Sequence, residues 1–388
     1  MYIRYLSKQK TGGVRMSDTR WLDEASEKIK KKMVKVAERN RHKIPYTTVD
    51  GVYDDWTDIN INWWTNGFWG GMMWQLYHAT KNPLYKEIAE ENELKLDKNL
   101  MNPYGMDHDS GFKWLTTSGA NYKMTGDKQS FERTFLAAEN LAGRFNPAGR
   151  FIRAWNDSGD GATAGWAIID CMMNLPLLYW AYEHTSDPRF YHIARLHAET
   201  VMKYFVREDY SVIHIGEFNP MTGEFIESKG GQGYAVGSSW TRGQAWAVYG
   251  FILSYIHTKE EIYLEYAKNI GRYFIDNIPE SGLIPVDFRQ PEECGLEDST
   301  AAAIAACGFI EIARYVEADE REYYHNAAIR LLKALYDNRC NFADDTDNIV
   351  ERCTAAFHDE KHEFAIIYGD YYFIEAIWKL TGQELFIW

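Results

Sequence analysis

Hydrophobic and polar positions follow two helical patterns along this chain. In one class of segment apolar residues occupy nearly every position, as in 66–79, 165–182 and 299–316. In the other class they form a single stripe, with an aromatic residue followed four positions later by alanine, as at Tyr85 and Ala89. Apolar residues recurring every three to four positions predict α-helices. A helix that is apolar on all sides must be buried, and a helix with one apolar stripe must lie outside it.

These patterns predict twelve helices, and the two classes alternate. The predicted helices cover residues 22–41, 60–80, 84–100, 110–125, 129–145, 163–184, 188–206, 239–257, 261–277, 297–316, 320–337 and 363–382. One buried helix plus one covering helix, repeated at roughly 50–70 residues, is typical of an array of helical hairpins. We therefore expect an all-α fold in which six hairpins close into an (α/α)6 barrel, a six-hairpin toroid.

Three long segments lack helical periodicity, at 146–162, 207–238 and 278–296. Long loops inside a compact fold usually carry function, so we expect these three to form the rim of a cavity. A short β-hairpin is a further prediction for 207–238. An open helical solenoid is the alternative arrangement, and it fits less well because its repeats are joined by tight turns.

No Pro-rich or Ser/Gly-rich linker divides the 388 residues, which contain only 10 prolines. Residues 21–388 are therefore expected to form one catalytic domain. Residues 1–20 lack an apolar core of signal-peptide length and are interpreted as a loose N-terminal leader, with Met16 as an alternative start.

Charge and cysteine content narrow the class of protein. The formal net charge of −14 argues against nucleic acid or an anionic membrane as a partner, because both need a basic surface. The most apolar stretch, 165–182, is interrupted by Asp170, Asn174 and Pro176 and so predicts a buried helix rather than a membrane span. Five cysteines without a CxxC pair indicate a reducing compartment, and we expect a cytoplasmic protein.

Aromatic residues make up 15% of the chain, an excess that fills a large core or lines a site for flat ligands such as sugars. Metal and nucleotide motifs are incomplete. A faint zinc-like spacing joins Cys340, Cys353, His358 and His362. It lacks a close cysteine pair. The calcium-like segment 156–161 has Ala167 where the last carboxylate should be, and 230–237 misses the spacing of a phosphate-binding loop. No metal and no organic cofactor are expected.

Two aspartates are the main catalytic candidates. Asp170 lies among apolar neighbours, and burial there would raise its pKa and make it a proton donor at neutral pH. A structural role at a kink made by Pro176 is equally open. Asp109 precedes a predicted helix, where it is either a simple N-cap or a second carboxylate held ionised by helix-end amides. Carboxyl groups in opposed environments could form an acid/base pair.

Arg242 is the candidate for local positive charge. It lies at the start of a predicted apolar helix between Trp240 and Trp246, where a guanidinium and helix amides could bind a carboxylate and indoles could stack on a sugar. An arginine paired to an acidic residue, with tryptophans as core filler, is the alternative. Further residues that could face the same cavity are His108, His214, Gln232, Trp63, Trp64 and Trp155.

Five segments together resemble a known family. They are WWTNGFWGGMMW (63–74), DHDSGF (107–112), IIDCMMNLPLLYWA (168–181), SWTRGQAWAVYGF (239–251) and IIYGDYYFIEAIWKL (366–380). In this order they are similar to segments of the unsaturated glucuronyl hydrolases, glycoside hydrolase family 88, from about residue 56 onward. That family has an (α/α)6 barrel, which agrees with the helix count.

The resemblance implies an enzyme that hydrates the 4,5-double bond of the unsaturated uronic acid left by polysaccharide lyases, with no cofactor. It implies Asp170 as general acid/base and Asp109 as second essential carboxylate. The sugar site would then be lined by His108, Trp155, His214, Gln232, Trp240, Arg242 and Trp246. Trp63 is a further candidate for this site. Relatives that prefer sulfated disaccharides carry Ser and Lys residues near 355–365, where this chain has Lys361 but no serine.

The expected partner is thus a small molecule, an unsaturated uronic acid-terminated disaccharide, and the oligomeric state is open. An unsaturated rhamnogalacturonyl hydrolase would share the barrel and the mechanism. A sugar epimerase on the same barrel would need a histidine pair, which the apolar segments do not offer. A non-catalytic toroid that binds proteins or sugars is the remaining alternative.

Overall fold

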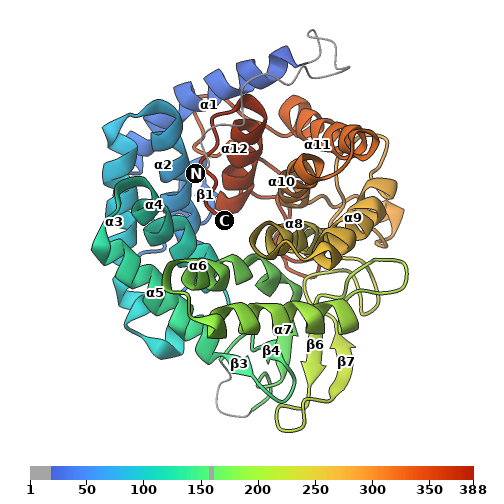
Figure 1. Cartoon of the computed structure of the whole chain (residues 1–388). Helices are drawn as coiled ribbons and strands as arrows, with labels where there is room; N and C mark the ends of the chain where they lie inside the picture. Colours follow the sequence, from blue (N-terminus) through green and yellow to red (C-terminus); the bar gives the residue numbers. More distant parts are fainter. Residues whose placement is uncertain (1–18, 157–160) are drawn as a thin grey trace.

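The computed structural model describes residues 19–156 and 161–388. Most of the expected leader, residues 1–18, lies outside the described residues, and so do four residues of the expected loop 146–162. Helices dominate the described parts (Figure 1). The α-helices are α1 (Arg20–Arg39), α2 (Phe68–Thr80), α3 (Pro83–Leu100), α4 (Ala120–Thr125), α5 (Lys128–Gly143), α6 (Leu175–Thr185), α7 (Pro188–Tyr204), α8 (Thr241–Thr258), α9 (Glu261–Asp276), α10 (Ser299–Tyr315), α11 (Ala318–Asn338) and α12 (Ile367–Thr381).

The helices form two concentric layers. The inner layer contains α2, α6, α8, α10, α12 and a π-helix, η3 (Gly111–Gly119), that continues into α4. Nearly every residue of α10 is buried, whereas α11 buries one stripe only. Each inner helix contacts the next, and α12 contacts α2, so the ring closes (Figure 1). The prediction of an (α/α)6 barrel is confirmed, because apolar segments are inside and amphipathic segments are outside.

Residues 163–184 do not form the single helix that periodicity predicts. They form strand β5 (Trp166–Ile168), the 3-10 helix η4 (Ile169–Met173) and then α6. Pro176 stands in the first turn of α6, where its missing N–H is tolerated, and it restricts the residue before it. Asp170 therefore lies on η4, ahead of α6 rather than within it.

The predicted hairpin in 207–238 is confirmed by β6 (Ile215–Phe218) and β7 (Phe225–Lys229), which pair antiparallel. Strand β5 pairs with the other edge of β6, with Ile168 opposite Ile215. The Ile169 amide then donates to the His214 carbonyl at 3.0 Å. This sheet places the Asp170 segment beside His214.

The remaining elements are short. Two-residue ladders pair β1 (Thr48–Val49) with β2 (Val52–Tyr53) and β3 (Phe145–Asn146) with β4 (Phe151–Ile152). Besides η4, the 3-10 helices in the described residues are η1 (Trp64–Gly67), η2 (Pro103–Gly105) and η5 (Glu292–Cys294). No helix among the described residues combines the length and apolarity needed to cross a membrane.

Aromatic rings fill the barrel interior. Phe112 contacts Trp246, Trp246 contacts Tyr372, and Tyr372 stacks on Trp388 with ring centroids 6.1 Å apart. All four side chains are buried. The high aromatic content is therefore used partly in the core, where these rings link η3, α8, α12 and the C-terminal segment.

Candidate active site

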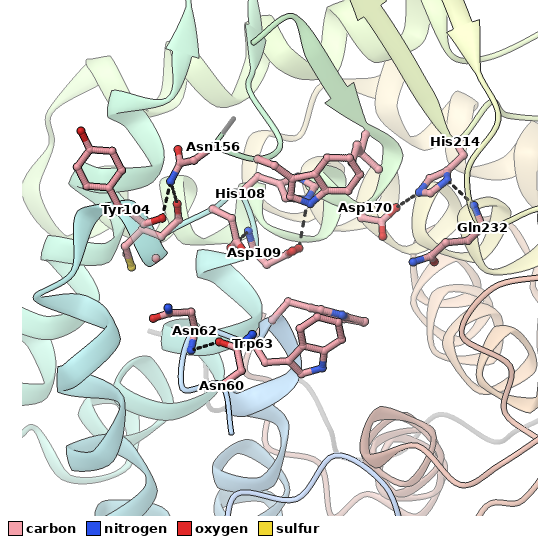
Figure 2. Close-up of a pocket in the computed structure, with 16 residues that line it drawn as sticks. Asn60, Asn62, Trp63, Tyr104, His108, Asp109, Asn156, Asp170, His214 and Gln232 are labelled. Carbon is pink, nitrogen blue, oxygen red and sulfur yellow. Dashed lines mark hydrogen bonds and ion pairs between the residues drawn. The ribbon is translucent and has the colours of Figure 1, made fainter. Parts of the chain in front are cut away.

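A cavity of about 480 Å³ opens among loops and helix starts of the barrel (Figure 2). Its lining residues are Asn60, Asn62, Trp63, Trp64, Tyr104, Gly105, Met106, Asp107, His108, Asp109, Trp155, Asn156, Ile168, Asp170, His214 and Gln232. This volume lies in the range of small-molecule sites. Two of the three loops expected at the rim, 146–162 and 207–238, contribute to the lining, whereas 278–296 does not.

Asp170 presents to this cavity a carboxyl group with a raised pKa. Its side chain is 16% exposed, and burial raises its pKa to about 7, an effect that Arg242 opposes. Its Oδ2 atom has no hydrogen-bond partner among the described residues. A carboxyl group of this kind exchanges a proton readily near neutral pH.

His214 faces Asp170 as a neutral imidazole. Burial, followed by the charge of Arg242, lowers the pKa of His214 to about 3. The backbone N–H of Gln232 donates to His214 Nδ1 at 3.0 Å, so the ring proton is assigned to Nε2. Nε2 lies 3.7 Å from Asp170 Oδ2. A neutral imidazole thus lies beside the acid, with Nε2 as the ring nitrogen nearer to it.

Asp109 lies in the turn before η3, with its side chain almost fully buried. Its Oδ1 accepts from Asn174 Nδ2 at 3.3 Å and lies 3.5 Å from His108 Nε2. Burial, then the charges of Asp107 and Asp170, raises its pKa well above the ordinary value.

The expectation that helix-end amides hold Asp109 ionised is wrong. The N-cap position of η3 is Ser110, and no side chain caps that end, so backbone amides do not compensate the buried charge of Asp109. Burial also lowers the pKa of His108 to about 3, which leaves this neighbour neutral. Burial and the charges of Asp107 and Asp170 thus favour the protonated form of Asp109, and burial favours the protonated form of Asp170.

Arg242 lies behind the cavity wall rather than in it. Its guanidinium is buried, forms an ion pair with Asp298, and donates to the Thr354 carbonyl at 2.6 Å and to Gln232 Oε1 at 2.8 Å. Since Oε1 of Gln232 is occupied, the NH₂ end of that amide remains for a ligand acceptor. Gln232 therefore links the buried Arg242 guanidinium to the cavity surface through this hydrogen bond.

The tryptophans divide into two groups. Trp63 and Trp155 line the cavity. Trp240 packs on His214 with ring centroids 4.3 Å apart and lies beneath the Arg242 guanidinium. Trp246 belongs to the core, in the aromatic column formed by Phe112, Trp246, Tyr372 and Trp388. Of the sequence-predicted site residues, Trp240, Arg242 and Trp246 do not line the cavity.

Sequence reasoning missed several polar residues of the site. Asn60, Asn62, Tyr104 and Asn156 line its far end from Asp170 (Figure 2). Among the described residues no three His, Cys, Asp or Glu side chains converge on a possible metal position. His358 and His362 of the faint zinc-like spacing contact backbone carbonyls instead.

Known proteins resemble this chain over most of its length. The family model described as Glycosyl Hydrolase Family 88 matches residues 25–387. The unsaturated glucuronyl hydrolase of Bacillus sp. (strain GL1) is 36% identical over 333 residues, 84% of this chain and 88% of that protein. The unsaturated chondroitin disaccharide hydrolase of Streptococcus pneumoniae is 33% identical over 88% of this chain and 87% of the relative. The solved structure of unsaturated glucuronyl hydrolase from Streptococcus agalactiae matches with a TM-score of 0.88 at 30% identity, over 98% of this chain and 99% of that one.

Proposed function

This chain belongs to glycoside hydrolase family 88, and from that premise we propose that it is an unsaturated glucuronyl hydrolase. It releases the 4,5-unsaturated uronic acid from the non-reducing end of lyase-generated glycosaminoglycan disaccharides and oligosaccharides. The observation that carries the proposal is Asp170, a cavity-lining acid whose pKa is about 7.

The reaction begins at the ring alkene, which is a vinyl ether. Asp170 donates its proton to C4, and the C4=C5 electron pair forms the new C–H bond, leaving positive charge shared by C5 and the ring oxygen. Water adds its oxygen to C5, and the Asp170 carboxylate accepts the proton that this water loses. The acid is thereby restored within one turnover.

The product of hydration is a hemiketal at C5. Its C5–O5 bond breaks to give a ketone at C5. O5 takes up a proton and becomes a hydroxyl group on C1, so C1 is now a hemiacetal. The C1 hemiacetal then opens to an aldehyde and releases the second sugar as an alcohol. Glycosidic cleavage therefore follows from hydration of the alkene, without direct displacement at C1.

The other cavity residues are assigned to binding. Gln232, backed by Arg242, offers its NH₂ group to the uronate carboxylate. Asp109 is the exception, because we assign it to the reaction as the second essential carboxyl group beside Asp170. We assign His108 to bind ring hydroxyl groups and the His214 Nε2–H to stabilise the Asp170 carboxylate after proton transfer. Trp63 and Trp155 offer ring faces to the sugars, while Trp240 and Trp246 support the wall and floor.

Asp170→Asn tests this function directly. The amide cannot donate and recover a proton, so the variant should fold yet fail to remove the ultraviolet absorbance of the alkene from an unsaturated chondroitin disaccharide. Asn338→Ala, in α11 on the outer layer, serves as a matched amide control that retains activity. Substantial turnover by Asp170→Asn would remove Asp170 from the role of acid.

A panel of lyase-made disaccharides then defines the substrate. Unsaturated chondroitin, hyaluronan and heparin disaccharides, sulfated and unsulfated, should be consumed in preference to an unsaturated rhamnogalacturonyl disaccharide. Faster consumption of the rhamnogalacturonyl substrate would reassign the protein to that specificity.

We further propose that residues 21–388 act as one catalytic domain in the cytoplasm. The five cysteines are all free thiols, and Cys294 is exposed, which suits a reducing compartment. Fractionation of the source cells with an antibody to the protein tests the location, and recovery in the secreted fraction would contradict it.

A further inference from the structure

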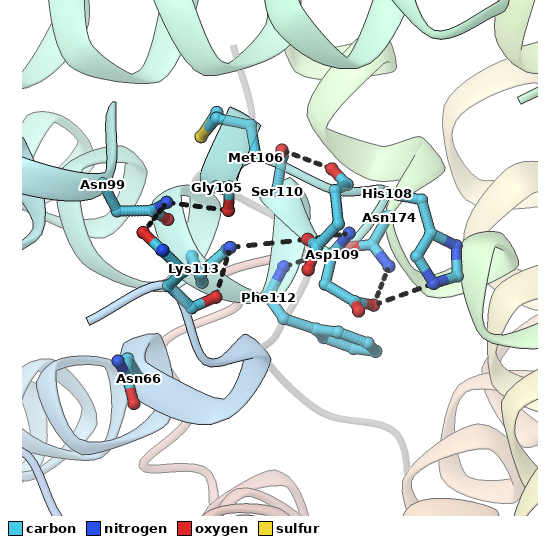
Figure 3. A network of polar contacts seen from close by, with 12 residues as sticks. Asn66, Asn99, Gly105, Met106, His108, Asp109, Ser110, Phe112, Lys113 and Asn174 are labelled. Carbon is cyan, nitrogen blue, oxygen red and sulfur yellow. Dashed lines mark hydrogen bonds and ion pairs between the residues drawn. The ribbon is translucent and has the colours of Figure 1, made fainter. Parts of the chain in front are cut away.

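Asn174 contacts both segments that carry the candidate catalytic carboxyl groups. It follows η4 and precedes α6, and its side chain is fully buried. One side-chain amide proton points to Asp109 Oδ1 at 3.3 Å and the other to the backbone carbonyl of Asp170 at 3.3 Å. Figure 3 shows Asn174 beside Asp109, toward the His108 end of the polar network around η3.

The orientation of this amide is fixed by its third contact. The Phe112 backbone N–H is a donor and lies 2.9 Å from Asn174 Oδ1. A donor must meet the oxygen of the amide, so the NH₂ group is the end that faces Asp109 and Asp170. Gly111 permits this close packing, because a Cβ atom there would lie 2.8 Å from Asn174 Oδ1.

We propose that Asn174 is a positioning residue that fixes the Asp109 carboxyl group relative to the Asp170 segment, so that both carboxyl groups act on one sugar ring. The proposal rests on the function given above. It assigns no chemical step to Asn174, because the reacting atoms are reached through Asp170 and Asp109.

The contact also favours the charged form of Asp109. The hydrogen bond from Asn174 lowers the pKa of Asp109, against burial and the charges of Asp107 and Asp170. Lys113 acts in the same direction: it is fully buried, lies 3.4 Å from Asp107 and donates to the Asn62 carbonyl at 3.2 Å. Of these groups only Asn174 also reaches the Asp170 segment.

Two substitutions separate positioning from packing. Asn174→Ala removes the donor, and the kcat of the variant should fall about 10-fold, the order expected for the loss of one buried hydrogen bond. Asn174→Asp keeps the shape but places a carboxylate against Asp109. Its protonated form can donate as the amide does, so its kcat relative to wild type should rise as pH is lowered, whereas that of Asn174→Ala should stay constant.

Asn121→Ala is the matched control. Asn121 is also a buried amide that donates to a buried carboxylate, Glu93 Oε2 at 2.7 Å, and it does not line the cavity. This variant should lose stability comparably in thermal unfolding and retain the wild-type kcat. Equal losses of kcat in Asn121→Ala and Asn174→Ala would overturn the proposal, as would a pH-independent ratio for Asn174→Asp.

A readout without substrate separates this proposal from the proposed function. Carboxyl ¹³C NMR of labelled aspartates, with Asp109→Asn for assignment, should show Asp109 titrating at higher pH in Asn174→Ala than in wild type. If wild type consumes no unsaturated substrate, the proposed function fails, but the titration still tests whether Asn174 acts on Asp109. An Asp109 titration that is the same in Asn174→Ala and wild type overturns that action. If wild type is active and Asn174→Ala keeps the wild-type kcat, the positioning role alone is overturned.

Discussion

Burial moves the pKa values of the Asp170 carboxyl group and the His214 imidazole in opposite directions, raising the first to about 7 and lowering the second to about 3. Desolvation penalises whichever form is charged. Near neutral pH Asp170 can therefore both hold and release its proton, and the nearby Arg242 charge favours the ionised form. His214 stays neutral over the same pH range.

Asp170 should consequently make folding depend on pH. Its pKa is about 7 in the folded protein, against an ordinary value of 3.8. Between these values the unfolded chain loses this proton while the folded protein keeps it, so the free energy of unfolding falls as pH rises through that window. Asp170→Asn removes the effect and should be more stable than wild type above about pH 7, by at most about 4 kcal/mol.

Urea unfolding of both proteins at a series of pH values checks this expectation. The difference in the free energy of unfolding should shrink toward acid and vanish near the ordinary aspartate value of 3.8. An Asp170→Asn variant that is less stable than wild type at high pH would show that the carboxylate is stabilised in the fold.

At the scale of elements, the helices could be predicted from apolar periodicity because burial of a face is what that pattern records. Two local features could not be predicted from this periodicity. The π-helix η3 depends on side-chain hydroxyls such as Thr116 bonding to carbonyls of the wide turns, and β5 depends on pairing with β6, 47 residues away along the chain by the Ile168–Ile215 register. Both features lie at the site, so sequence identified its aspartates but not the contacts that hold them.

The close approach of η1 and η3 gives a test at this scale. A Cβ atom on Gly67 would lie 2.3 Å from the Phe112 carbonyl oxygen and 2.6 Å from Lys113 Cα, both backbone atoms. Gly67→Ala should therefore push the two elements apart and destabilise the fold by about 3 kcal/mol.

Thermal and urea unfolding measure this loss. Gly143→Ala is the control, because a Cβ atom there meets nothing within 4 Å and the position lies in α5. It should be neutral or stabilising by up to about 1 kcal/mol. Equal stability of Gly67→Ala and wild type would show that the two elements can separate freely.

At the scale of the whole molecule, the C-terminal segment closes the barrel interior. Trp388 is 4% exposed, stacks on Tyr372, contacts Phe112 of η3 and Tyr249 of α8, and donates from Nε1 to Glu375 Oε2 at 2.9 Å. One side chain thus joins three inner elements that are distant in sequence. The ring of helices is therefore stabilised by the contacts of Trp388 in its interior as well as by contacts between neighbouring helices.

Trp388→Ala should destabilise the protein by about 3–5 kcal/mol, since it opens a cavity and leaves the buried Glu375 without this donor. Trp388→Phe keeps a ring and should cost less. Urea unfolding measures both changes, and a Trp388→Ala variant within about 1 kcal/mol of wild type would show that the interior repacks.

The aromatic column has a consequence for how a long sugar chain can be used. Phe112, Trp246, Tyr372 and Trp388 fill the space beneath the site, so a polymer has no passage through the toroid. Only a chain tip can enter, and the remainder must stay outside the mouth. We therefore expect this enzyme to act at chain ends only, removing one terminal residue from each chain that enters the mouth.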